Sequence, residues 1–468
     1  MTLAGSPEIL FTPGIPLLLV SPMAFGLANA TVLPLISAVA FLALVLLVYK
    51  SVRVRFGETS GTIAGITTAL NGLLFNWAAR GFAEIIWAPF LLAGLIGISQ
   101  KRLSVKLLAG ASLALAYLIK PETLPYLLLF LAVQLVLQGR MFLSRALAVA
   151  LVPLVATIIG YSTYIFVNSG TVALTGKGTL FATDQWVENE DYSFDEAVYR
   201  LNEDLTVGIK PDATGLSGVN IPKRIIYNVV AFGIVVSEIL FPLALVMVAI
   251  VLGAVSSRGY RRNLLAVGVI LLPVTVGLVL HFEARYLIGV LLVGIGFMSA
   301  AMALFLTKTS PRSRLLVTIP LLALVIFTVS SWTKVTARYE VAITQHRYAN
   351  EVKKYLKPYD TVVSRIPIYS YLYEKDYSPM PVTNDPSRLE RYLGKLDRPV
   401  IVFDEWTEKE GSVVELLRKR YGLKVHEKAV VDPGNGKVLY RGKVHEQIVS
   451  SPNYPKNIRN AQGLDEER

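Results

Sequence analysis

Long apolar runs separated by short polar connections cover most of residues 31–332. A run of about 18 apolar residues or more is long enough to cross a hydrocarbon core about 30 Å thick. The runs are continuous rather than alternating, and inside lipid only helices and closed barrels satisfy every backbone polar group, so the pattern predicts helices. Ten spans are predicted, at Thr31–Tyr49, Gly61–Ala78, Phe82–Ser99, Ser104–Leu118, Leu124–Leu137, Ala146–Val167, Ile226–Ala254, Asn263–Leu280, Leu287–Leu306 and Leu315–Trp332.

The stretch before the first span is apolar but interrupted. Leu10–Ala28 contains Pro13, Pro16 and Pro22, and a proline inside a helix removes a backbone hydrogen bond. We interpret this broken stretch as a juxtamembrane or re-entrant segment rather than as a span.

After the last span the composition becomes that of a soluble domain, in which helical and strand-like runs alternate. This alternation is typical of a small α/β domain. Its helical runs are Tyr339–Leu356 and Ser412–Tyr421, and its strand-like runs are Thr361–Ser364, Val400–Phe403, Lys424–Val431 and Lys437–Tyr440. The predicted parts of the chain are an outer juxtamembrane segment at 1–30, a transmembrane helical domain at 31–332 with an outer loop at 168–224, an extracytoplasmic α/β domain at 333–450 and a disordered tail at 451–468.

Composition supports a membrane protein. Hydrophobic residues make up 53% of the chain and charged residues only 17%, against about a quarter charged in soluble proteins. The net charge of +12 would suggest nucleic acid in a soluble protein, but the basic residues mostly flank the spans, so we expect no nucleic-acid partner. The absence of cysteine excludes disulfides, thiolate chemistry and cysteine metal sites.

Groups of closely spaced basic residues follow every second span, as one consistent topology requires. They are Lys50, Arg53 and Arg55, Lys101, Arg102 and Lys106, Arg140 and Arg145, Arg258, Arg261 and Arg262, and Lys308, Arg312 and Arg314. These connections are predicted to face the cytoplasm, which places the alternate loops and the C-terminal domain outside the plasma membrane. Residues 1–30 then also lie outside, and we expect a further span upstream of them.

Three clusters of ionisable residues lie at the predicted outer ends of spans. They are Arg80 with Glu84, the turn Lys120-Pro121-Glu122, and the group His281, Glu283, Arg285 and Tyr286. These outer turns carry acids beside bases, whereas the inner connections are almost purely basic. Ordinary surface residues would explain any one cluster, because long cationic side chains reach the interface, but positive-inside topology does not predict such clusters together on the outer face.

Cations and carboxylates of this kind suit a lipid-linked phosphate. Arginine and lysine bind phosphate oxygens, and glutamate accepts a proton, binds a hydroxyl or coordinates a metal. We therefore hypothesise an outer-face phosphate site. Glu122 could equally pair with Lys120 or cap the next helix, and His281 is interpreted as an interfacial residue, so no metal site is predicted.

Short motifs in these regions resemble the GT-C superfamily of membrane glycosyltransferases, in particular protein O-mannosyltransferases, which use dolichyl-phosphate-mannose, and the lipid A aminoarabinose transferase. Phe11-Thr12-Pro13-Gly14-Ile15-Pro16 with Phe25-Gly26 is similar to the family's Pro-rich segment, and Ala79-Arg80…Glu84 to the opening of its fourth span. Leu118-Ile119-Lys120-Pro121-Glu122 is similar to its Arg-Pro-Glu turn, with lysine in place of arginine, and Ala284-Arg285-Tyr286-Leu287 to the Arg-Tyr that opens a late span. Asp360–Ser364 and Tyr369–Tyr373 resemble its outer α/β domain.

The resemblance implies an enzyme that moves a sugar from a polyprenyl-phosphate donor to a lipid, glycan or protein acceptor on the outer face. Arg80, Lys120 and Arg285 would bind the donor phosphate, supported by Glu84, Glu122, His281, Glu283 and Tyr286. The family's general base is an acid of the first outer loop, which would precede Phe11, and Glu8 is the only acid before that residue.

Some alternatives stay open at this stage. A divalent cation is compatible with the resemblance, because some relatives need one. A non-catalytic transporter, assembly partner or ligand-binding protein of the same fold is the second hypothesis, although charges near the bilayer midplane and internal repeats, which are typical of transporters, are not evident. The acidic outer loop 168–224 is interpreted as a solvated face that by analogy covers the site.

Overall fold

The structure is a computed structural model. The described residues are 12–25, 29–79, 81–138, 144–170, 172–174, 288–307, 350–364, 376–380, 386–403, 411–424 and 427–443, with single positions between 325 and 348. The predicted spans at 226–254 and 263–280, most of the span at 315–332 and nearly all of the loop at 168–224 lie outside these residues. The chain forms two compact units, one helical and one built around a sheet.

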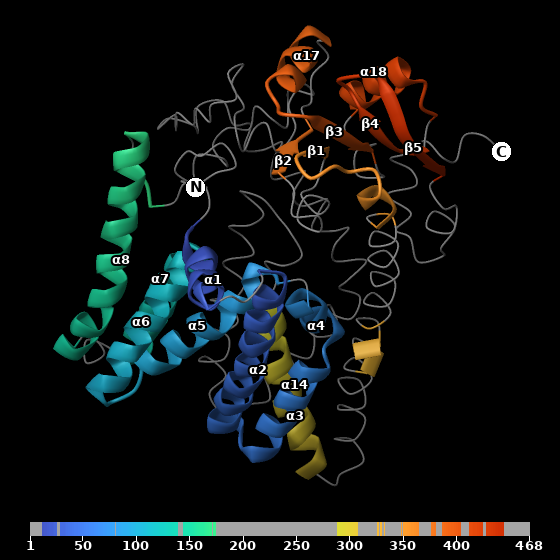
Figure 1. Cartoon of the computed structure of the whole chain (residues 1–468). Helices are drawn as coiled ribbons and strands as arrows, with labels where there is room; N and C mark the ends of the chain where they lie inside the picture. The colour runs from blue at the N-terminus through green and yellow to red at the C-terminus, as the bar shows by residue number, and fades with distance from the viewer. Residues whose placement is uncertain are drawn as a thin grey trace, which may run out of the picture. The chain divides into compact units, whose positions relative to one another are not determined.

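Nine helices of the helical unit have described bounds (Figure 1). They are α1 (Gly14–Ala24), α2 (Asn29–Phe56), α3 (Glu58–Leu70), α4 (Gly72–Ala79), α5 (Ala83–Ile98), α6 (Leu103–Ile119), α7 (Thr123–Gln138), α8 (Arg145–Ser169) and α14 (Ile288–Thr307). By length and composition α2 and α8 can each cross a membrane, and the bent pair α4–α5 is a third candidate. The count of ten spans stays a prediction.

The predicted span Gly61–Ala78 is not one continuous helix, because the chain breaks at Asn71 into α3 and α4. The Asn71 backbone is extended, and its Oδ1 accepts a hydrogen bond from the Leu74 N–H at 2.9 Å, as an N-cap side chain does. The Leu70 carbonyl at the break accepts a bond from Trp332 Nε1 at 2.8 Å. The apolar sequence pattern therefore does not reveal this helix boundary, which depends on the buried side-chain amide of Asn71.

The proline-containing stretch also differs from its prediction, because residues 14–24 form a helix rather than a broken segment. Pro13 precedes α1 and Pro16 lies in its first turn, where backbone N–H groups have no partner within the helix. Only Pro22 lies beyond the first turn of this helix. With 11 residues, α1 is too short to cross a bilayer by itself.

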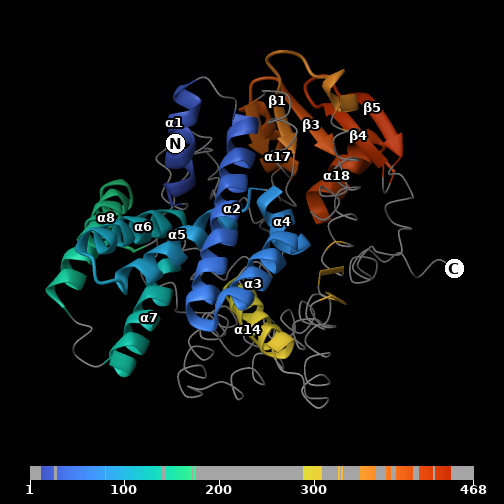
Figure 2. The same cartoon turned by 90° about the horizontal axis from the view of Figure 1, so that it is seen from below.

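Small residues bring the helices of this unit close together. α5 packs along α6, and α6 packs along α8, an arrangement that Figure 2 also shows. At Gly97 of α5 an added Cβ would lie 2.5 Å from the Ala109 Cβ of α6. At Gly110 of α6 it would overlap the Ala150 carbonyl oxygen of α8. Such contacts between small residues are typical of helix packing in membranes.

The second unit contains a five-stranded mixed sheet. Its strands are β1 (Thr361–Ser364), β2 (Asp376–Pro379), β3 (Pro399–Phe403), β4 (Glu427–Asp432) and β5 (Lys437–Lys443), and its helices α17 (Pro386–Gly394) and α18 (Gly411–Tyr421). The order is β2-β1-β3-β4-β5, parallel across β2, β1 and β3 and antiparallel from β3 to β5.

Alternate side chains of the strands enter two hydrophobic clusters, as the two-residue period of a strand requires. Val363 and Ile401 pack in the cluster that contains residues of α17 and α18, whereas Val362 and Val400 pack in a cluster with Tyr348. Because both faces of the central strands are covered, β1 is buried along its whole length and β3 is apolar throughout.

Candidate functional site

A short turn between α6 and α7 carries two of the predicted site residues. Lys120 ends α6 in an extended conformation, with φ −146° and ψ 116°, because a residue that precedes proline is disfavoured in the helical region. Pro121 and Glu122 form the turn, and Thr123 begins α7. The Lys-Pro-Glu sequence therefore ends one helix and turns the chain into the next.

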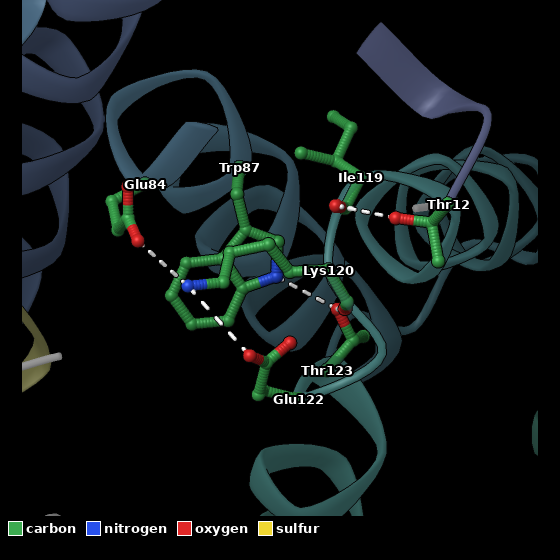
Figure 3. Close-up of polar contacts among 7 residues, drawn as sticks. All are labelled: Thr12, Glu84, Trp87, Ile119, Lys120, Glu122 and Thr123. Carbon is green, nitrogen blue, oxygen red and sulfur yellow. Dashed lines mark hydrogen bonds and ion pairs between the residues drawn. The ribbon is translucent and has the colours of Figure 1, made fainter. Parts of the chain in front are cut away.

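The Lys120 ammonium lies between two carboxylates (Figure 3). Its Nζ is 2.8 Å from Glu84 Oε1 and 3.8 Å from Glu122 Oε1. Glu84 comes from the first turn of α5, so the pair joins two helices. The side chains of Lys120 and Glu84 are only 7% and 3% exposed, whereas that of Glu122 is 39% exposed. The ion pair with Glu84 is therefore almost completely shielded from solvent.

Aromatic rings and a hydroxyl group surround this ion pair. The Lys120 Nζ lies 5.7 Å from the centroid of the Trp87 ring, which is within the range of a cation–π interaction. Trp87 Nε1 donates a hydrogen bond to Thr123 Oγ1 at 2.8 Å, and Thr123 Oγ1 donates one to the Lys120 carbonyl at 2.8 Å. Tyr126 packs edge-on against Trp87 at 5.4 Å. Residues of α5, α6 and α7 thus enclose one ammonium group.

The segment before α1 contacts the same turn. Thr12 Oγ1 donates a hydrogen bond to the Ile119 carbonyl at 2.9 Å (Figure 3). An added Cβ on Gly14 would lie 2.5 Å from the Ile119 nitrogen and from backbone atoms of Leu118. The Thr12-Pro13-Gly14 motif therefore fixes the last turn of α6, directly before Lys120.

We expect Gly14→Ala to lower stability by about 2 kcal/mol, because its Cβ would meet backbone atoms that cannot rotate away. Thr12→Val removes only the hydrogen bond to Ile119 and is expected to cost about 1 kcal/mol. The two losses of stability are measured from the unfolding of each variant and of the native chain in detergent. Equal temperatures for Gly14→Ala and the native chain would show that α1 does not hold this turn.

The cluster formed by Glu84, Lys120 and Glu122 contains one basic and two acidic side chains. One ammonium faces two carboxylates in mostly apolar surroundings, where attraction between opposite charges exceeds that in water. Glu122 Oε2 is buried and has no hydrogen-bond partner among the described residues. Within the part of the chain that the structure describes, no group of three or more His, Asp or Glu side chains is arranged to hold a metal ion.

The structure brings together Glu84, Lys120 and Glu122, which the sequence placed in two separate outer clusters. The other predicted residues lie outside the described residues, and they are Glu8, Arg80, His281, Glu283, Arg285 and Tyr286. Sequence analysis missed Trp87 and Thr123. A signal was present for Trp87, because it follows Glu84 by three positions in α5, a spacing that places side chains on one helix face.

Comparison with known proteins gives a likeness of fold. No family model and no curated protein matches the sequence. The structure is similar to that of ArnT from Cupriavidus metallidurans in the apo state, with a TM-score of 0.51 and 10% identity over 94% of this chain and 88% of that chain. A crystal structure of ArnT from the same organism bound to undecaprenyl phosphate also matches, with a TM-score of 0.43 and 12% identity. This match again includes 94% of this chain and 88% of that chain. Together with its long apolar helices, the likeness to the apo structure makes this chain an integral membrane protein with a GT-C-like fold.

Proposed function

We propose that this chain is a glycosyltransferase that takes a sugar from a polyprenyl-phosphate donor and transfers it to a lipid, glycan or protein acceptor. The observation that carries the proposal is the buried ammonium of Lys120, held at a helix end between Glu84 and Glu122 in a membrane protein of GT-C-like fold. A buried cation beside lipid is costly and is usually functional. Undecaprenyl phosphate, which ArnT binds in its second structure, is the kind of polyprenyl phosphate that a donor of the proposed class becomes when it loses its sugar.

The proposed reaction places a growing negative charge near Lys120. An acceptor hydroxyl or amine attacks the anomeric carbon of the donor sugar, and the bond from that carbon to the phosphate oxygen breaks. The electron pair of this bond leaves with the oxygen, so the phosphate changes from a singly charged diester to a more highly charged monoester. Lys120 stabilises this charge, as a fixed cation does in a site that excludes water.

The remaining roles follow the family resemblance. Arg80 and Arg285 are proposed to bind the same phosphate, with His281, Glu283 and Tyr286 as supporting residues. The proton of the acceptor passes to a general base, for which Glu8 is the candidate in this chain. The site is proposed to lie on the outer face of the plasma membrane, as is the sheet unit.

A second candidate is a ligand-binding membrane protein that performs no transfer. The observation that favours it is the ion pair itself, because Lys120 already has a carboxylate at 2.8 Å and is 5% exposed. A phosphate would then bind beside a neutralised lysine, and it would not be consumed.

The test is a transfer assay with the full chain in lipid nanodiscs and a panel of radiolabelled polyprenyl-phosphate sugars. We expect one donor to lose its sugar to added membrane lipid, glycan or peptide, and Arg285→Ala to reduce this turnover at least 100-fold, which is the order of effect for losing a group that stabilises transition-state charge. Arg145→Ala is the matched control, since Arg145 lies on the predicted cytoplasmic side. Full activity in Arg285→Ala would remove that residue from the site, and binding of every donor without turnover would favour the second candidate.

A further inference from the structure

We propose that Trp87 and Thr123 are positioning residues that fix the Lys120 ammonium where the donor phosphate arrives. The proposal rests on the proposed function, because it assigns these residues a role in the same transfer. Its geometric basis is a hydrogen bond from Trp87 to Thr123, a second from Thr123 to the Lys120 carbonyl, and a contact between the Trp87 ring and the Lys120 ammonium.

The first part of this arrangement fixes the backbone of Lys120. Thr123 Oγ1 donates to the Lys120 carbonyl at 2.8 Å and accepts from Trp87 Nε1 at 2.8 Å. Trp87 is 3% exposed and Thr123 is fully buried. A buried hydroxyl that both donates and accepts has a single favourable orientation, so the two bonds define where α6 ends relative to α5.

The second part restricts the side chain of Lys120. Its Nζ lies 5.7 Å from the Trp87 ring centroid, and Trp87 is itself held by the edge-on contact with Tyr126. Lysine is among the side chains with the largest conformational entropy. A ring on one side and Glu84 at 2.8 Å limit the positions that this long chain can take.

Positioning matters more for this reaction than for simple binding. The charge on the phosphate increases during transfer, so an ammonium in a fixed position stabilises the transition state more than the bound donor. A misplacement of about 1 Å can cost on the order of 100-fold in rate. Loss of the two hydrogen bonds should therefore lower kcat more than it raises KM.

The variants separate positioning from general stability. Trp87→Phe keeps an aromatic ring but removes the N–H, and Thr123→Val keeps the shape but removes the hydroxyl. Each is expected to lower kcat about tenfold with KM changed less than about threefold. The double variant is expected to lower kcat by about tenfold relative to the native chain, no more than either single variant. The reason is that both single changes break the hydrogen bond between Trp87 and Thr123. Thr123→Ser should restore turnover.

The matched control is Trp332→Phe, which also removes an indole hydrogen bond from the helical unit, the one to the Leu70 carbonyl. It should leave kcat and KM at their native values. A drop in kcat in this control equal to that in Trp87→Phe would overturn the proposal, because any lost tryptophan bond would then have the same effect.

A readout that needs no turnover keeps the proposal distinct from the proposed function. Amine labelling of the full chain in detergent, measured by peptide mass spectrometry, compares buried Lys120 with exposed Lys101. Thr123→Val should raise the labelling rate of Lys120 several-fold relative to Lys101. If no donor is consumed by the native chain but labelling responds, the proposed transfer and the role of these residues in it fail, and only the fixing of Lys120 by Trp87 and Thr123 stands. Unchanged labelling together with native kcat in both single variants would refute the positioning.

Discussion

Replacing Lys120 with methionine is expected to abolish transfer and to destabilise the helical unit by roughly 3–5 kcal/mol. The change removes the ammonium 2.8 Å from Glu84 Oε1, where both side chains are almost fully buried. A buried carboxylate that loses its counter-charge keeps its desolvation penalty and loses the attraction that offset it. Unfolding curves in detergent and the transfer assay measure the two effects.

The double variant Glu84→Leu with Lys120→Met separates stability from function. A buried ion pair replaced by apolar side chains of similar size is often neutral for stability, so the double variant should unfold close to the native temperature. It should remain inactive, because no ammonium faces the phosphate. Native turnover in this stable double variant would show that Lys120 serves folding alone. Lys120→Arg, which keeps a positive charge at this position, should retain measurable transfer.

Gly110→Ala is expected to cost about 3 kcal/mol of stability. Its Cβ would overlap the Ala150 carbonyl oxygen of α8, and neither of the two backbones can yield without moving a whole helix. Overpacking of this kind usually costs about 1–3 kcal/mol, and a backbone-to-backbone overlap belongs at the upper end. The measurement is the unfolding temperature of the full chain in detergent.

Gly160→Ala is the control for this substitution. Gly160 lies in α8, and no described atom lies within 4 Å of its added Cβ. Alanine is a better helix former than glycine, so this variant should match or slightly exceed the native stability. If Gly110→Ala and Gly160→Ala lowered stability equally, the cause would be a general intolerance of α6 and α8 to alanine and not the close packing of the two helices.

Much of the secondary structure follows from local patterns. The strands β1, β3, β4 and β5 and the helix α18 lie where the alternation of apolar and polar runs predicts them, within a few residues at their ends. β2 was missed because Asp376–Pro379 is short and polar, and it becomes a strand only by pairing in parallel with β1. Pairing of this kind depends on residues distant in sequence.

The candidate site, like the secondary structure, could be predicted only in part from the sequence. Charged residues stand out in an apolar sequence, so Glu84, Lys120 and Glu122 could be selected, although their role in binding a donor stays a prediction. Their mutual arrangement could not be predicted, because it depends on how α5 meets α6 and α7. Trp87 and Thr123 are ordinary residues of apolar helices, and only their hydrogen bonds reveal what they hold.

The ion pair between Glu84 and Lys120 also constrains how the chain enters the bilayer during synthesis. Glu84 leaves the ribosome 36 residues before its partner, and α5 has only 16 residues, fewer than the roughly 20 of a typical independent span. A lone carboxylate costs a few kcal/mol on partitioning into lipid. We therefore expect the translocon to retain α5 until α6 has been made, and to release the two as a hairpin whose opposite charges neutralise each other.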